Sequence, residues 1–214
     1  MAAAIQKLLY QPPDGLDKHI SGKLMDEVRD ILPQYGMPTE RLAPLKPWML
    51  AATLGVLEAT RQGYSQMLGI DTYFLARAKS TNKPIVELES IEIQISIFES
   101  FAPQEQEVFL QKTIDGIKNG SAQSELDEIR AAWRTGDVRR LEKLIPNDQG
   151  KDAPVVERVM EKVVFQRNAA MASKIEEYLN TGRVHFVAVG AVHFAGRQGI
   201  VELLRGKGYV VSQR

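Results

Sequence analysis

Two side chains capable of acid–base chemistry follow short apolar runs. Glu89 follows the run Ile85–Leu88, and His193 lies three residues after Gly190, which ends the run Val184–Val189. If both runs are strands of one parallel sheet, their carboxyl ends meet at the edge where ligands of open sheets gather. A carboxylate and a neutral imidazole there can share a divalent metal or act as an acid–base pair. With equal weight, Glu89 caps the next helix and His193 bonds to its own loop.

An arginine lies in the apolar stripe of a long predicted helix. Arg167 is surrounded at helical spacing by apolar residues: Met160, Val163, Val164, Met171, Ile175 and Tyr178. A guanidinium that points into a core must be paired, because an uncompensated buried charge is costly. Glu89 or Asp71 is the natural partner. The pattern by itself favours a structural ion pair or a side chain that reaches to solvent, and the adjacent Asn168 either orients a ligand or caps a strand end.

The elements that would position these residues follow from periodicity and from Pro and Gly breaks. Apolar spacing predicts helices over 16–32, 48–61, 70–79, within 91–144, over 151–179 and over 196–205. Short apolar or alternating runs predict strands over 85–89, 184–189 and 209–211. Strand, helix and strand at the end form a βαβ unit. We therefore expect one α/β domain over 1–214, with a small, mainly parallel sheet, a large helical portion and a helical excursion at about 91–150.

Composition excludes several classes of function. The 214 residues carry 27 basic and 27 acidic side chains, so no long-range field attracts nucleic acid, and we expect no nucleic-acid partner. The absence of cysteine removes disulfides, thiolate metal ligands and a cysteine nucleophile. No apolar run reaches the length of a membrane span, and residues 1–9 do not read as a secretory signal. The glycines do not form a nucleotide-binding fingerprint.

The remaining histidines and the tryptophans have ordinary structural interpretations. His19 stands among polar residues and is expected to be solvated, whereas His185 lies inside a predicted buried strand. Trp48 and Trp133 are expected to belong to the core, since each has apolar neighbours at helical spacing.

Several segments, taken in order, resemble the TraB/GumN family, a bacterial relative of the Tiki peptidases and erythromycin esterase-like proteins. The resemblance covers most of the chain from about Pro12. Its specificity comes from the combination: Leu45–Trp48, Gly69–Asp71 with Phe74–Lys79, Lys83–Ser90 with Glu92 and Gln94, Arg167-Asn168 with Met171-Ala172, and Val187–His193 with Gly196, Gly199 and Gly208-Tyr209.

The resemblance implies a Tiki/TraB-like fold and a metal-dependent hydrolase of the peptidase type. In that family two Gly-x-x-His motifs and acidic residues are proposed to bind the metal, and Gly190 to His193 matches the second motif. His193 and Glu89 are then the implied ligands of a divalent zinc, manganese or cobalt ion. Arg167 and Asn168 complete the implied catalytic set by positioning a carbonyl or carboxylate of a peptide or small-molecule substrate. From the same resemblance we expect Gly190 and Asp71 to be cofactor-binding positions.

The sequence departs from the family pattern at its amino-terminal end. No first Gly-x-x-His motif precedes the segments above, so His193 and Glu89 supply at most two of the three protein ligands that a catalytic zinc usually takes. We therefore expect a truncated form of the fold that is incomplete or inactive as a hydrolase by itself. The alternative is a non-catalytic, envelope-associated binding protein.

The same departure bears on assembly and location. Without the first strands of the family fold, one sheet edge is uncovered, and we expect self-association through that edge. The resemblance favours a periplasmic location, with the cytoplasm as the alternative.

Overall fold

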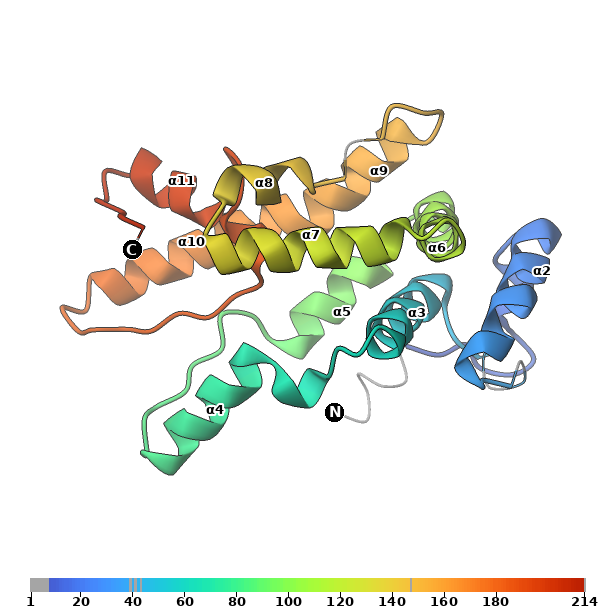
Figure 1. Ribbon diagram of the computed structural model, residues 1–214, viewed down its shortest axis with the longest axis horizontal. Coiled ribbons are helices and arrows are strands. Elements are labelled where there is room, and N and C mark those ends of the chain that lie inside the picture. Colours follow the sequence, from blue (N-terminus) through green and yellow to red (C-terminus); the bar gives the residue numbers. More distant parts are fainter. Residues whose placement is uncertain (1–7, 39, 41, 43, 147, 214) are drawn as a thin grey trace. The chain divides into compact units, whose positions relative to one another are not determined.

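The computed structural model describes residues 8–38, 40, 42, 44–146 and 148–213. The expectation about a secretory signal therefore lies mostly outside the described residues. The chain forms two compact units, each built from helices (Figure 1). Unit 1 contains the described residues up to Tyr64, Ile91–Leu126 and 148–159. Unit 2 contains Ser65–Ser90, Asp127–Pro146 and the described residues from Met160 onward.

Unit 1 packs its helices around one leucine-rich core. Pro47 opens the helix α3, where its fixed φ suits the first turn and its missing N–H is not needed. Leu50 and Leu54 of α3 lie fully buried with Leu110 and Ile114 of α6. The elements of this unit are η1 (Leu16–Lys18), α2 (Gly22–Ile31), η2 (Leu32–Tyr35), α3 (Pro47–Arg61), α5 (Ile91–Glu99), α6 (Pro103–Lys118), the start of α7 (Ser121–Thr135) and most of α9 (Ala153–Met160).

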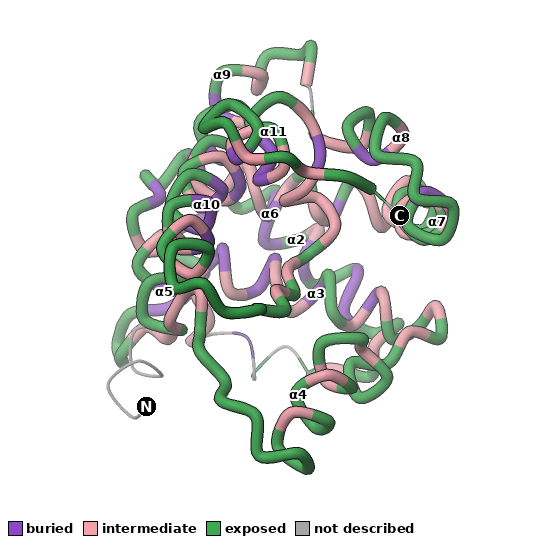
Figure 2. The backbone as a smooth tube through the Cα atoms, turned by 90° about the vertical axis from the view of Figure 1, so that its left-hand side faces the viewer, coloured by how far each residue is buried: buried purple, intermediate pink, exposed green. Residues whose placement is uncertain are grey.

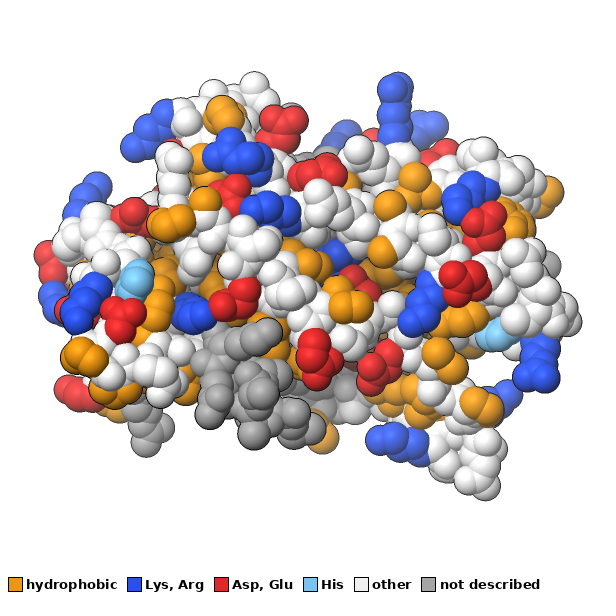
Figure 3. Space-filling model, turned by 180° about the vertical axis from the view of Figure 1, so that it is seen from behind, with side chains coloured by type: hydrophobic (Ala, Val, Ile, Leu, Met, Phe, Trp, Pro, Cys, Tyr) orange, Lys and Arg blue, Asp and Glu red, His pale blue; other side chains and the backbone are white. Residues whose placement is uncertain are grey.

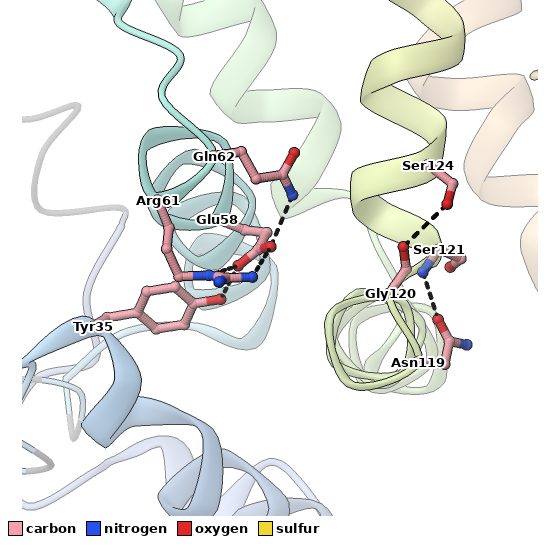
Figure 4. A network of polar contacts seen from close by, with 8 residues as sticks. All are labelled: Tyr35, Glu58, Arg61, Gln62, Asn119, Gly120, Ser121 and Ser124. Atoms are coloured by element: carbon pink, nitrogen blue, oxygen red, sulfur yellow. Dashed lines mark hydrogen bonds and ion pairs between the residues drawn. The ribbon is translucent and has the colours of Figure 1, made fainter.

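A buried carboxylate ties the end of α3 to η2 in unit 1 (Figure 4). Glu58 is only 3% exposed. Its oxygens accept hydrogen bonds from Arg61 Nε at 2.9 Å and Nη2 at 2.7 Å, and from Tyr35 Oη and Gln62 Nε2 at 2.8 Å each. Because the charge is paired and both oxygens accept bonds, this network stabilises the fold and leaves Glu58 no free lone pair aimed at a ligand.

Unit 2 is organised around α10. Its Met171, Ala172 and Ile175 form a buried cluster with Ile200 and Leu204 of α11, and the purple segments of α10 in Figure 2 mark this face. The elements are η4 (Gln66–Leu68), α4 (Ile70–Ser80), the rest of α7, α8 (Val138–Lys143), the π-helical turn η5 (Glu161–Phe165), α10 (Gln166–Leu179), η6 (Ala191–Phe194) and α11 (Ile200–Gly206).

The predicted α/β fold with its small parallel sheet is wrong for the described residues. The three predicted strands, 85–89, 184–189 and 209–211, are irregular extended segments and not strands. The one isolated bridge in the described part of the chain is the antiparallel pair Leu9 and Leu45 in unit 1. Each extended segment turns part of its apolar side chains onto the α10–α11 cluster: Leu88, Val187, Val189, Tyr209 and Val211. The helices α10 and α11 bury these apolar side chains, as neighbouring strands and helices would in a parallel sheet, so their burial does not require hydrogen bonds between strands.

The run 184–189 also differs from its predicted burial. Val187 and Val189 face the cluster, whereas Val184 is fully exposed and Phe186 is 70% exposed. This alternation is typical of an extended segment covered on one side only. His185 is consequently exposed instead of buried, and its ring stacks on Tyr178.

Most predicted helices are present with nearly the expected bounds, including the breaks before Pro103 and at Asn119–Ser121. The helix expected over 16–32 is instead η1, α2 and η2, because Ser21 caps α2 through its side chain and starts it later. Trp48 is buried as predicted, but Trp133 is 55% exposed. Within the described residues, no helix is both long and apolar enough to cross a bilayer.

Candidate functional site

The helix that carries Arg167 changes its winding just before that residue. The turn Glu161–Phe165 is π-helical, and α10 begins at Gln166. The Arg167 side chain folds back so that Nη1 donates to the carbonyl oxygen of Val163 at 3.0 Å, inside this turn. Insertions of this kind in helices are frequent at functional sites. Here the guanidinium is held against the widened turn and does not extend freely into solvent.

Arg167 is paired with Glu89, which is one of the two partners, Glu89 or Asp71, that the sequence predicted. Arg167 Nε donates to both carboxylate oxygens at 3.0 Å, and Nη2 donates to Oε2 at 2.7 Å. The two side chains are 18% and 7% exposed. A charge-assisted, two-nitrogen contact of this geometry fixes both groups. Glu89 comes from the extended segment after α4, so the ion pair also fastens that segment to α10.

Asn168 connects α10 to the loop between η6 and α11. Its side chain is completely buried. The amide Nδ2 donates to the carbonyl oxygen of Gln198 at 2.8 Å, and Oδ1 lies 2.6 Å from Nδ1 of His193. A carbonyl oxygen can only accept, so Nδ2 must face Gln198, and Oδ1 must then face the imidazole. It follows that Nδ1 of His193 carries a proton, and in the neutral ring Nε2 then keeps its lone pair.

The turn that carries His193 is packed tightly. Ala191 and Ala195, at its ends, belong to a small cluster with Leu141 of α8. A Cβ added at Gly199 would lie 2.6 Å from the carbonyl oxygens of Phe194 and Ala195. Glycine is required there because the loop approaches its own backbone too closely for any side chain. The imidazole is therefore held on a rigid turn.

The environment keeps His193 neutral. Burial lowers the pKa of the imidazole, and the nearby Arg167 guanidinium lowers it further, while the Glu89 carboxylate raises it. A neutral imidazole with a free Nε2 can accept a proton or bind a cation at pH 7.

The structure thus brings together four predicted residues in two bonded pairs, Glu89 with Arg167 and Asn168 with His193. The pairs are linked because Arg167 and Asn168 are neighbours on α10. Gly190 lies beside the ring, since a Cβ there would stand 3.6 Å from Cδ2 of His193. Asp71 is separate: it lies in the first turn of α4, and the described residues show no hydrogen bond or ion pair between it and the other predicted site residues.

The donor set does not fit a complete metal centre. The described residues contain no group of three or more His, Asp or Glu side chains that could hold a metal. His193 Nε2 is one suitable donor, but the Glu89 carboxylate is held through both oxygens by Arg167. A catalytic zinc site needs three protein ligands. For the expected zinc, manganese or cobalt ion, His193 Nε2 is therefore the one clear ligand among the described residues.

Two groups in the site were not predicted from the sequence. The carbonyl oxygens of Gln198 and Val163 orient Asn168 and Arg167 respectively. Main-chain carbonyls have no sequence signature, so no residue type pointed to them. Gly199 offered an indirect signal, because a glycine opening a helix often marks a close backbone approach.

Comparison with known proteins identifies the class. The sequence model of the TraB/PrgY/gumN family matches residues 1–213, and the chain belongs to this family. Among its relatives is the uncharacterized protein YbaP of Escherichia coli (strain K12), 24% identical over 192 residues, which are 90% of this chain and 69% of YbaP. YbaP of Shigella flexneri matches equally.

A more distant relative is named as an enzyme. The chain is 30% identical to the metalloprotease TIKI homolog of Amphimedon queenslandica over 76 residues, which are 35% of this chain and 15% of that protein. No solved structure matches the chain significantly.

Proposed function

We propose that unit 2 carries one part of a hydrolytic centre in which His193 acts through Nε2. The observation that carries this proposal is the fixed chain of contacts from Gln198 through Asn168 to His193 Nδ1. Buried hydrogen-bonded networks that orient one imidazole nitrogen and leave the other free are typical of general bases and of metal-ligating histidines.

In this proposal the free nitrogen accepts a proton from the attacking water. The lowered pKa of His193 keeps Nε2 unprotonated at neutral pH, as a base requires. As Nε2 takes the proton, positive charge forms on the ring, and Nδ1–H donates more strongly to Asn168 Oδ1. The Glu89 carboxylate favours the same charged state, which partly offsets the opposing effect of Arg167.

Arg167 is suited to hold a substrate oxygen. A guanidinium has five N–H groups. Nε donates to Glu89, one N–H of Nη2 donates to Glu89, and one N–H of Nη1 donates to Val163. One N–H on each terminal nitrogen remains available for the carbonyl or carboxylate oxygen of a substrate, where developing negative charge is stabilised.

The name of the Amphimedon relative suggests a peptide bond as the substrate and a metal as the cofactor. His193 Nε2 would be a ligand if a metal binds this chain, and the metal would activate a water molecule. Because the donor set found in the described residues is incomplete, we assign no further ligand and no step through a metal.

The experiment that tests the proposal uses the whole chain and a peptide library, with and without added zinc, manganese or cobalt. We expect hydrolysis that is lost in His193→Gln and retained in His185→Gln, the matched control in the same unit. Mass spectrometry of the products identifies the bond that is cut. Hydrolysis that survives in His193→Gln overturns the assignment of His193.

A second candidate function is binding without catalysis. The specific observation in its favour is that Glu89 is closed off by Arg167 and cannot act freely as an acid or base. This candidate predicts no hydrolysis by the wild-type chain under any metal condition, together with saturable binding of a carboxylate-bearing peptide. Arg167→Lys should weaken that binding because a lysine cannot make the planar two-nitrogen contact.

A further inference from the structure

The extended segment 184–189 presents main-chain groups that have no partner. Apart from the contacts of neighbouring turns, no main-chain hydrogen bond joins residues 184–189 to the rest of the described chain. Its side chains alternate, with Val187 and Val189 on the α10–α11 cluster and Val184 and Phe186 exposed. Residues 184–189 are not part of a sheet, but their unpaired main-chain groups, called the open edge below, form a template on which a strand can be added.

The spacing of these groups defines what can occupy the edge. Donors and acceptors that recur every second residue are matched by another extended backbone, which offers the complementary repeat. The exposed Val184 and Phe186 favour apolar side chains at alternate positions of the incoming chain. The occupant is therefore an extended polypeptide segment.

Charge narrows the choice of polypeptide. Unit 2 has 16 Lys and Arg against 11 Asp and Glu, a formal charge of +5, although the whole chain is neutral. Arg183, directly before the segment, is exposed, and no ion pair is recorded for it in the described residues. Lys83 stands in the same position before the extended segment 84–88. A second copy of unit 2 would meet like charge, whereas an acidic peptide is attracted.

Apolar surface continues beside this edge on the same unit. Phe74 of α4 contacts the ring of Phe186, with centroids 4.5 Å apart. The helix α4 has no buried residue, and Ile70, Tyr73 and Leu75 are exposed. Figure 3 shows hydrophobic side chains beside Lys and Arg in the region of α4, at the lower right.

We propose that residues 184–189 bind an acidic, extended polypeptide by strand addition, with an acidic residue of the ligand paired to Arg183. The segment leads directly through Gly190 into the His193 turn, so a bound chain runs along the approach to that turn. This binding goes beyond the proposed function, because it does not depend on whether His193 takes part in hydrolysis.

Fluorescence anisotropy with labelled eight-residue peptides tests the proposal. The first probe alternates Val and Thr between two terminal Glu residues, and the control probe has Lys at both ends. We expect the acidic probe to bind at least about tenfold more tightly. Two further probes carry backbone N-methyl groups on odd or on even residues. Because only alternate residues of a strand face the partner edge, one of these should lose binding and the other keep it.

Variants of the whole chain locate the site. Arg183→Glu should weaken the acidic probe about tenfold and reverse the preference toward the lysine probe. The matched control Arg139→Glu, on the exposed face of α8, changes the net charge equally and should leave the preference unchanged. Circular dichroism verifies that both variants fold. Equal effects of the two variants overturn the role of Arg183.

Two other results also overturn the proposal. One is binding that tolerates both N-methyl patterns, which excludes strand addition. The other is a dimer in light scattering whose amide exchange protection falls on residues 184–189 without any probe, which makes a second copy the occupant. Protection of alternate amides in this segment only when the acidic probe is present supports the proposal.

Discussion

Asn168 Oδ1 and His193 Nδ1 lie 2.6 Å apart, and the opposite end of the same amide donates to the carbonyl oxygen of Gln198. This relationship fixes which imidazole nitrogen carries the proton. The acid–base behaviour of His193 thus depends on a completely buried, uncharged side chain from a different element of unit 2.

Replacement of Asn168 should affect both stability and the imidazole. Asn168→Leu removes both hydrogen bonds of a completely buried side chain and leaves the half-buried Nδ1–H of His193 without its partner, so the free energy of unfolding should fall by about 1–3 kcal/mol. Asn168→Asp places a carboxylate against Nδ1 and should raise the pKa of His193. Urea denaturation measures the first effect, and an NMR titration of the imidazole measures the second. An unchanged pKa in Asn168→Asp would contradict the contact.

The ion pair between Arg167 and Glu89 should show strong coupling. Arg167→Met leaves a carboxylate that is 7% exposed without its partner, and unfolding should become easier by about 3–5 kcal/mol. The double variant Arg167→Met/Glu89→Leu removes both charges and should be more stable than Arg167→Met alone. Denaturant titration of the two single variants and the double variant checks this. Additive losses would show that the pair is not coupled.

Stability should depend on pH through His193. The pKa of His193 in the folded chain is lowered by burial and by Arg167. At a pH between this lowered pKa and the ordinary pKa of histidine, the unfolded chain therefore binds more protons than the folded chain. The stabilisation is complete above about pH 6.5, the ordinary value, and declines as pH falls toward the folded pKa. His193→Gln should lose this slope. Arg167→Gln should raise the pKa of His193 and flatten the slope.

A separate acid transition should come from Glu58 in unit 1. Hydrogen bonds from Arg61, followed by those from Gln62 and Tyr35, lower the pKa of Glu58 from 4.5 to about 2 despite burial. Its contribution, on the order of 3 kcal/mol, is present above pH 4.5 and is lost as pH falls toward 2. Thermal unfolding of wild type and Glu58→Gln between pH 2 and 6 measures it. Parallel curves for the two proteins would refute this assignment.

Two glycines near the site, Gly199 and Gly190, should differ in how well they tolerate replacement by alanine. Gly199→Ala brings a Cβ to 2.6 Å from two main-chain carbonyl oxygens, so the loop must shift, at a cost of about 1–3 kcal/mol. Gly190→Ala makes only an ordinary 3.6 Å contact with the His193 ring and should change stability by less than about 1 kcal/mol. Thermal melts of both variants make the comparison. Equal losses would mean that the loop is less closely packed than described.

Helices were predictable from the sequence because their signals are local. Pro103 opens α6 and Asn119 ends it, and both act within one turn. The partner of Arg167 was also narrowed correctly to Glu89 or Asp71, since a guanidinium in an apolar stripe requires an acid.

The sheet was not predictable in the same way. The run Val184–Val189 is apolar in every position except His185, and this composition does not reveal whether a helix or a neighbouring strand covers it. The site contacts made by main-chain carbonyls of Val163 and Gln198 depend on the π-helical turn and the Gly199 loop. Such contacts arise from tertiary packing and leave no residue pattern.

The most direct measurement is the nitrogen-15 NMR spectrum of the His193 side chain at neutral pH, assigned with His193→Gln. The account predicts a protonated Nδ1 and an unprotonated Nε2, a form that becomes mixed in Asn168→Leu. A ring protonated at Nε2 in the wild-type chain, or one indifferent to the loss of Asn168, would contradict it.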